Sequence, residues 1–222
     1  MSRHLPLAAL CALCLLAACA RPLSPNERAV AESLFGPSLD TGKVQITAGL
    51  GLVPLPRPHP EAQAAARRPT APPPGLCDRH RSTRRVWTWP AAFVMDNTIY
   101  FAFPYYSADA FAGFPASAPF PASVLLVHEL THVWQRQNAG QTGYSMARAA
   151  GESLARVDPY WFEADPKAAF LSYGYEQQAA MVQDFVCYAL FDRTSPRLAD
   201  LAAQLRPVLP VDGFLARLAE GR

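Results

Sequence analysis

The stretch Ser123-Val-Leu-Leu-Val-His-Glu-Leu-Thr-His-Val-Trp-Gln-Arg-Gln137 contains the spacing His-Glu-x-x-His within a strongly apolar run. The recurrence of its apolar residues predicts a buried helix, with Ser123 as its N-cap and its end at residues 138–140. His128 and His132 are four residues apart, so on a helix they lie one above the other on the same face. Their imidazoles can therefore bind one metal ion together.

Glu129 lies about 100° around the helix from His128, where its carboxylate can reach a water on the metal. Metal-assisted hydrolysis requires two neutral ligands, an adjacent carboxylate base and an open position for water, and zinc is the metal that this spacing indicates. The alternative is an ordinary amphipathic helix with two polar histidines. The apolar surroundings favour the metal site, because burying unpaired histidines and a glutamate is costly.

Catalytic zinc usually has three protein ligands and a water, so a third ligand is needed. No histidine follows His132 in the chain, which indicates a carboxylate. Glu176 is the first candidate, because it lies in the first turn of a second long predicted helix, residues 173–190. Ala179 and Ala180 of that helix are small enough for close packing against the helix that contains His128 and His132, which we call the metal helix. The alternative for Glu176 is a carboxylate placed by the helix dipole alone. Weaker candidates for the third ligand are Asp184, Glu163, Glu152 and His80.

The pattern along the chain predicts an α+β fold that is mainly helical, with a small sheet upstream of the His-Glu-x-x-His helix. Residues 96–97 have the composition of a turn between the last two strands. The predicted strands are residues 43–47, 86–89 and 97–103. The other predicted helices are residues 25–35, 144–156, 196–206 and 213–219, and the predicted loops are residues 104–122 and 140–143.

Length and composition favour one globular domain with tails. The chain has 222 residues, half of them apolar, and a formal net charge of +2, so nothing indicates a nucleic-acid partner. Eight prolines between residues 53 and 75 predict an exposed loop. The basic residues 78–85 indicate a solvated face, or alternatively contact with anionic lipid or cell-wall polymer. The expected divisions are a lipoprotein signal peptide at 1–19, a tether with a helix and a strand at 20–52, the proline-rich loop at 53–76, and the domain with the metal helix at 77–222.

Residues 1–19 have a short basic start and then an apolar stretch that is too short for a comfortable membrane span, which is typical of a secretory signal. They end in Leu16-Ala17-Ala18-Cys19, which resembles the bacterial lipobox, in which the cysteine is lipidated and becomes the mature N-terminus. The alternative is an ordinary signal peptide with incidental cysteines. Residue 20 is Ala rather than Asp, a pattern that in Gram-negative lipoproteins implies transfer to the outer membrane. We expect a lipid-anchored protein on the periplasmic face of that membrane.

Two further cysteines, Cys77 and Cys187, remain after the signal segment. In an oxidising periplasm they can form a disulfide. The alternative is a buried Cys187 in an apolar helix and a separate Cys77 in a loop, and the sequence leaves both open because it does not give the Cα separation.

The helix around Leu126–Gln135, preceded by the strand Thr98-Ile-Tyr-Phe101, resembles the zincin superfamily and its glutamate-ligand branch, the gluzincins. It is more closely similar to a metallopeptidase domain with a His-Glu-Leu-Thr-His-x-x-Gln helix that is often found beside contractile injection system genes and is labelled vgr-related. The resemblance is strongest over residues 86–190. It implies that His128, His132 and Glu176 are zinc ligands and that Glu129 is the catalytic base.

One position departs from this pattern. Many gluzincins have an Asp four residues after the ligand Glu, where this chain has Ala180, so Gln183 or Asp184 would have to orient the ligands. Tyr173 and Tyr175, next to Glu176, are candidate donors to the oxyanion of the reaction, with core packing as the alternative.

The expected function is that of a monomeric zinc peptidase of the cell envelope, acting on protein or peptide. The competing interpretation is an envelope lipoprotein in which zinc is structural or the cleft only binds peptide, so that the protein acts as an adaptor.

Overall fold

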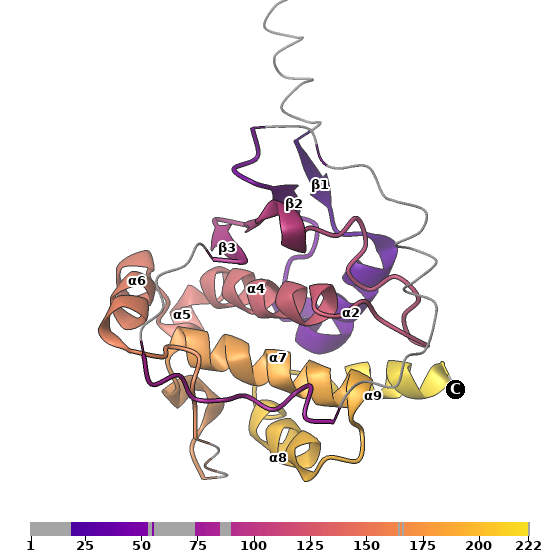
Figure 1. Cartoon of the computed structure of the whole chain (residues 1–222), viewed down its shortest axis with the longest axis vertical. Helices are drawn as coiled ribbons and strands as arrows, with labels where there is room; N and C mark the ends of the chain where they lie inside the picture. The colour runs from indigo at the N-terminus through magenta and orange to yellow at the C-terminus, as the bar shows by residue number, and fades with distance from the viewer. Residues whose placement is uncertain are drawn as a thin grey trace, which may run out of the picture.

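A four-stranded sheet covers one side of a larger helical body in the computed structural model, which describes residues 19–52, 55, 74–84, 90–163, 165 and 167–221 (Figure 1). The strand order is β1-β2-β4-β3, with β2 and β4 parallel and the other pairs antiparallel. The strands are β1 (Ala20–Pro22), β2 (Gln45–Ala48), β3 (Ala92–Met95) and β4 (Thr98–Phe101). The fold is therefore mixed α+β with a small sheet upstream of the metal helix, as the sequence predicts.

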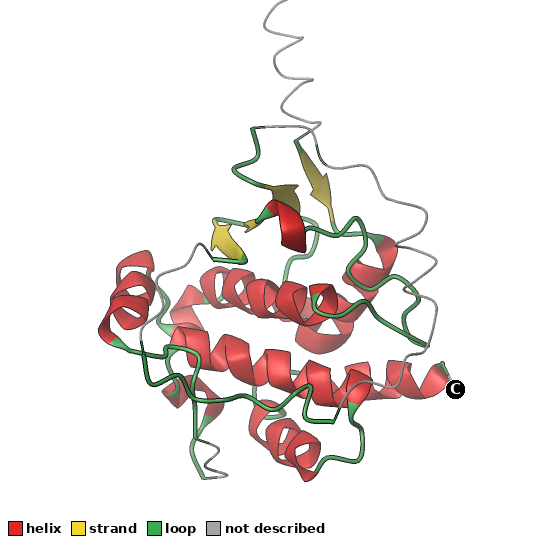
Figure 2. Ribbon diagram, viewed as in Figure 1, coloured by secondary structure: helices red, strands yellow, loops and turns green. Residues whose placement is uncertain are grey.

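Helices make up most of the regular structure (Figure 2). The helix α4 lies between the sheet and α7, and the two helices run side by side (Figure 1). The α-helices are α2 (Pro25–Phe35), α4 (Ala122–Gln137), α5 (Ala139–Thr142), α6 (Met146–Ala155), α7 (Tyr175–Phe191), α8 (Pro196–Leu205) and α9 (Val211–Glu220). Short 3₁₀ turns lie at Gly36–Ser38, Phe103–Tyr105 and Phe170–Ser172.

The contact between α4 and α7 is the centre of the core. Ala179 and Ala180 of α7 are fully buried, as are Leu130 and Val133 of α4. Small side chains on one helix let the other approach closely, which brings polar groups of the two helices within reach of one another. This close approach positions the residues of the candidate site.

The helix α2 begins and ends where the sequence predicts. Ser24 accepts a hydrogen bond from the Glu27 N–H, and the Glu27 carboxylate accepts one from the Ser24 N–H, which forms a capping box. Gly36 ends the helix with a φ of 56°. Arg21 of β1 donates two hydrogen bonds to Glu27, so the edge strand is tied to the helical body.

A segment that we call the strap, residues 76–80, crosses the surface of α7 (Figure 1). Cys77 forms a disulfide with Cys187, which resolves the alternative that the sequence left open. The next residue, Asp78, accepts a hydrogen bond of 2.8 Å from the Tyr188 hydroxyl. Arg79 then makes a bidentate ion pair with Asp184.

Some local expectations were wrong. Residues 20–22 form an edge strand rather than a tether, since the backbone of β1 pairs with β2. Ser123 lies inside the first turn of α4 and donates to the Pro119 carbonyl instead of capping the helix. Residues 140–142, expected in a loop, belong to the short helix α5.

The third strand of the observed sheet also differs from the prediction. The sequence did not predict β3, whose Phe93 stacks on Tyr100 of β4 with ring centroids 4.9 Å apart. Residues 1–18 of the predicted signal peptide, the predicted strand at 86–89 and most of the proline-rich loop lie outside the described residues. None of the described helices is both long and apolar enough to cross a membrane.

Candidate metal centre

Three donor atoms meet between α4 and the first turn of α7. The Nε2 atoms of His128 and His132 are 3.2 Å apart, and the Oε2 atom of Glu176 lies 3.1 and 3.2 Å from them. In a tetrahedral zinc site with bonds of about 2.0–2.1 Å, two ligand atoms are roughly 3.3 Å apart. The three donors therefore fit the edges of such a site, and two imidazoles with one carboxylate are a donor set that zinc accepts.

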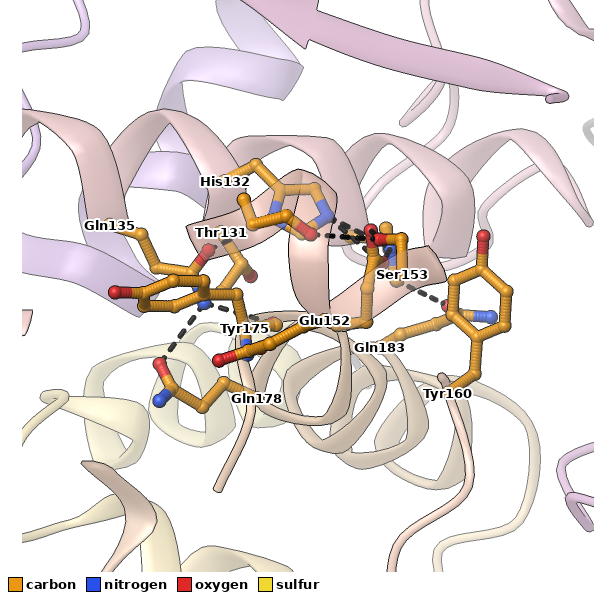
Figure 3. A network of polar contacts seen from close by, with 12 residues as sticks. Thr131, His132, Gln135, Glu152, Ser153, Tyr160, Tyr175, Gln178 and Gln183 are labelled. Atoms are coloured by element: carbon orange, nitrogen blue, oxygen red, sulfur yellow. Dashed lines mark hydrogen bonds and ion pairs between the residues drawn. The ribbon is translucent and has the colours of Figure 1, made fainter. Parts of the chain in front are cut away.

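Each imidazole is oriented by a glutamine on the side away from this cluster (Figure 3). The Nδ1 atom of His132 lies 2.9 Å from Gln135 Oε1, and that of His128 lies 3.0 Å from Gln183 Oε1. The amide nitrogen of Gln135 donates to the Tyr175 carbonyl and to Gln178, so its oxygen must face His132. An amide oxygen only accepts, so Nδ1 of His132 carries the proton and Nε2 is left to bind a metal.

The charges of the cluster support one another. Burial lowers the pKa of His132, but Glu176, Glu129 and Gln135 together outweigh burial and raise the pKa to about 9. Burial likewise opposes ionisation of Glu176, yet the two imidazoles hold the pKa of that carboxyl well below its usual range. Glu176 is thus an anion that is available as a ligand, and a metal that binds here must displace a proton from His132.

Glu129 faces the same pocket. Its side chain is 5% exposed, and its Oε2 atom is buried without a hydrogen-bond partner. Burial raises the pKa of the Glu129 carboxyl, more than attraction from His128 and His132 lowers it. A buried carboxylate oxygen with no protein partner is costly, so it indicates a position held for another group such as a water or a substrate.

The pocket above these residues has a volume of about 420 Å³. Its walls come from the edge strand β3, from α4, from α6 and, through Glu176, from α7. Tyr160, labelled in Figure 3, also lines the pocket. Its ring centroid is 5.7 Å from that of His128. The centre therefore opens into a cleft large enough for one or two amino-acid side chains.

The helix α6 supports the start of α7. The Glu152 carboxylate accepts a hydrogen bond of 2.7 Å from the Tyr175 N–H, which caps the first turn. Ser153 Oγ lies 3.5 Å from Glu176 Oε1, the oxygen that does not face the histidines. Glu152, a weaker candidate for the third ligand, thus has a capping role in the structure.

The other weaker candidates lie away from the histidines. Asp184 is paired with Arg79, and Glu163 and His80 are exposed. Among the described residues, Glu176 is the acid that joins the two histidines. Cys19, the expected lipidation site, is buried at the start of β1, where its carbonyl accepts a hydrogen bond from Thr47.

The structure does not bring the two candidate oxyanion donors to the pocket. The Tyr175 hydroxyl donates to the Gly143 carbonyl at 2.5 Å, and the Tyr173 hydroxyl donates to the Glu163 carbonyl at 3.0 Å. Two tyrosines that the sequence did not single out, Tyr144 and Tyr160, line the pocket, and the Tyr160 ring lies beside that of His128. Burial raises the pKa of Tyr160 to about 12, so its hydroxyl remains a donor at neutral pH.

Comparison with solved structures finds the effector domain of Pseudomonas aeruginosa VgrG2b. The two chains are 22% identical, the match covers 90% of this chain and 94% of that one, and the TM-score is 0.49. No protein-family model matches the chain, and no curated protein does.

Proposed function

We propose that the protein is a zinc-dependent peptidase of the bacterial cell envelope, with the zincin-like site that the sequence resembles. The observation that carries this proposal is the unpartnered Glu129 oxygen in the pocket that also contains the donor cluster. A structural zinc site is closed by four protein ligands and has no use for a buried base. Three donors beside a buried carboxylate and an open cleft are instead what hydrolysis requires.

His128, His132 and Glu176 would hold the zinc ion, which supplies an activated water and polarises a carbonyl. Glu129 Oε2 takes the proton of the attacking water and delivers it to the leaving amine nitrogen. Its burial favours this role, since a raised pKa makes the carboxylate a stronger base. The Tyr160 hydroxyl donates to the carbonyl oxygen as negative charge develops there.

An extended peptide is the substrate that the cleft favours. β3 is the last strand in the sheet order, so one of its edges has no strand partner within the described sheet. Phe93 and Val94 of this strand line the pocket beside His128. An exposed strand edge can pair with the backbone of an extended peptide, which would lay a scissile bond across the site.

An envelope location is proposed from two features. The lipobox-like end of the signal segment, Leu16–Cys19, indicates a lipid anchor. The disulfide Cys77–Cys187 agrees with an oxidising compartment.

The competing proposal is an adaptor whose zinc is structural. A hydroxamate separates the two, because it binds zinc only where a coordination position is open. We expect a hydroxamate to bind the zinc-loaded protein, whereas a closed site would ignore it.

Substitution Glu129→Gln is the decisive test. The amide keeps the size of the side chain but cannot accept the water proton, so peptide hydrolysis should fall by at least about 100-fold. Zinc content, measured by elemental analysis, should remain one ion per chain. His132→Ala is the control and should lose both zinc and hydrolysis. Unchanged hydrolysis by Glu129→Gln would remove the catalytic role.

A further inference from the structure

Several strands begin or finish at the same end of the sheet. The parallel register of β2 and β4 places Ala48 beside Phe101, so the segments that follow both strands leave the sheet at the same end. The antiparallel register of β1 pairs Ala20 with Thr47, so the chain enters β1 at this end as well. The entry residue, Cys19, accepts a hydrogen bond from the Thr47 hydroxyl.

Large apolar side chains are exposed at this end. Leu50 and Leu52, after β2, are 68% and 77% exposed, and Phe103, after β4, is 51% exposed. Tyr105, two residues after Phe103 in the sequence, is also exposed. We call these four residues the apolar tip.

Glycines bring the two segments of the apolar tip together. Gly49 has a φ of 60°, and a Cβ atom there would lie 2.8 Å from the Phe103 ring. The ring therefore packs directly on the glycine backbone, next to Leu50. The turn at Gly49 therefore joins the segment after β2 to the segment after β4 within the apolar tip.

This surface has no charge of its own. Residues 47–52 and 101–107 contain no Asp, Glu, Lys or Arg. The nearest arginine in β1, Arg21, is committed to Glu27 and to the Ser107 carbonyl. An uncharged surface of leucines, a phenylalanine and a tyrosine suits the boundary between lipid headgroups and acyl chains, where a tyrosine has both an apolar and a wet environment.

We propose that the apolar tip inserts into a lipid bilayer, an inference that rests on the lipid anchor at Cys19 proposed above. A bilayer is the expected partner of the tip because of where the chain enters the fold. Cys19, the residue that the lipobox pattern marks for acylation, immediately precedes β1 at this same end. An anchor at Cys19 holds the tip against the membrane, and burial of the tip then fixes the orientation of the domain.

The test is a depth measurement on the full chain, produced in a bacterial host and reconstituted into vesicles of phosphatidylethanolamine and phosphatidylglycerol. A fluorophore sensitive to polarity is attached at Leu52→Cys. Leu154→Cys on α6 is the matched control, because Leu154 is a leucine that is 59% exposed outside the tip. The unsubstituted chain, treated with the same fluorophore, gives the background from other cysteines.

At position 52 we expect a blue shift of emission on reconstitution and strong quenching by brominated lipids, with neither effect at position 154. Adding Leu50→Ser and Phe103→Ser to the Leu52→Cys chain should reduce both effects. Equal quenching at positions 52 and 154 would overturn the proposal. So would a label at position 52 that is shielded from both brominated lipid and aqueous iodide, since this would indicate an interface between two copies. None of these outcomes depends on peptidase activity.

Discussion

Two carboxylates of α7, Glu176 and Asp184, lie eight residues apart and have opposite surroundings. Glu176 faces two imidazole nitrogens and an open pocket, and its pKa is held low. Asp184 is buried beneath the strap, and both of its oxygens accept from Arg79. Burial nevertheless raises the pKa of Asp184, more than the guanidinium lowers it.

The difference shows that the partner decides what a buried acid can do. A guanidinium fork occupies both carboxylate oxygens and leaves no ligand atom for a metal. Two imidazoles fixed through their Nδ1 atoms direct their Nε2 atoms toward Glu176 Oε2, so three donor atoms lie close together. We therefore assign Glu176 to metal binding and Asp184 to holding the strap on α7.

The largest expected effect is from Glu176→Gln. The amide has no charge to offer the metal, so zinc affinity should fall by more than about 100-fold, beyond the loss seen when only an outer partner of a ligand is removed. Competition with a chelator measures this. Stoichiometric zinc in Glu176→Gln would contradict the assignment and redirect attention to Asp184, Glu163 or His80.

Asp184→Asn should show the reverse behaviour. Arg79 would lose its anionic partner, and the free energy of unfolding should fall by roughly 2–4 kcal/mol, somewhat below the range for fully buried pairs. The discount reflects the Arg79 side chain, which is 19% exposed. Urea unfolding measures the loss, and zinc content should be unchanged. A double variant, Arg79→Met with Asp184→Leu, should recover part of the stability if the loss comes from the unpaired arginine.

Reduction of the Cys77–Cys187 disulfide should loosen the same strap. The two cysteines are 110 residues apart in sequence, so the bond restricts a long loop of the unfolded chain. The expected loss of unfolding free energy is about 2–4 kcal/mol. Denaturant titrations with and without a thiol reductant measure it, and Cys77→Ser should reproduce the reduced chain. Coincident titrations would show that the disulfide contributes nothing to stability.

The smallest effect is expected from Gln183→Leu. Loss of the hydrogen bond to His128 leaves the ligand in place but less well oriented, so zinc affinity should fall about 10-fold. Gln135→Leu should cost more, because Gln135 also bonds the Tyr175 carbonyl and Gln178. Equal losses in the two variants would mean that the contacts of Gln135 with α7 add nothing.

The sequence was informative where the signal is local. The helical period of α4 depends on neighbouring residues alone, and the helix was predicted correctly. The four-residue spacing then places His128 and His132 on one face of it. Placing Glu176 needed only the further prediction that α7 packs closely on α4 through small residues.

The rest depends on how distant segments meet. Tyr173 and Tyr175 are near Glu176 in sequence, but the start of α7 directs their hydroxyls to other loops. Tyr160 lies in an aromatic turn without periodicity, so nothing in the sequence indicated that it reaches His128. The strand β3 was missed because the pairing of Phe93 with Tyr100, rather than a strong alternating pattern, supports it.

The unpartnered oxygen of Glu129 has a cost for the folded protein as a whole. Replacing this side chain with an apolar one of similar size would remove a desolvated acceptor from the interior, which generally increases thermal resistance. At this position, the residue that favours thermal stability is therefore not the residue that favours catalysis. A form of the protein selected only to survive heating would be expected to give up this acid first.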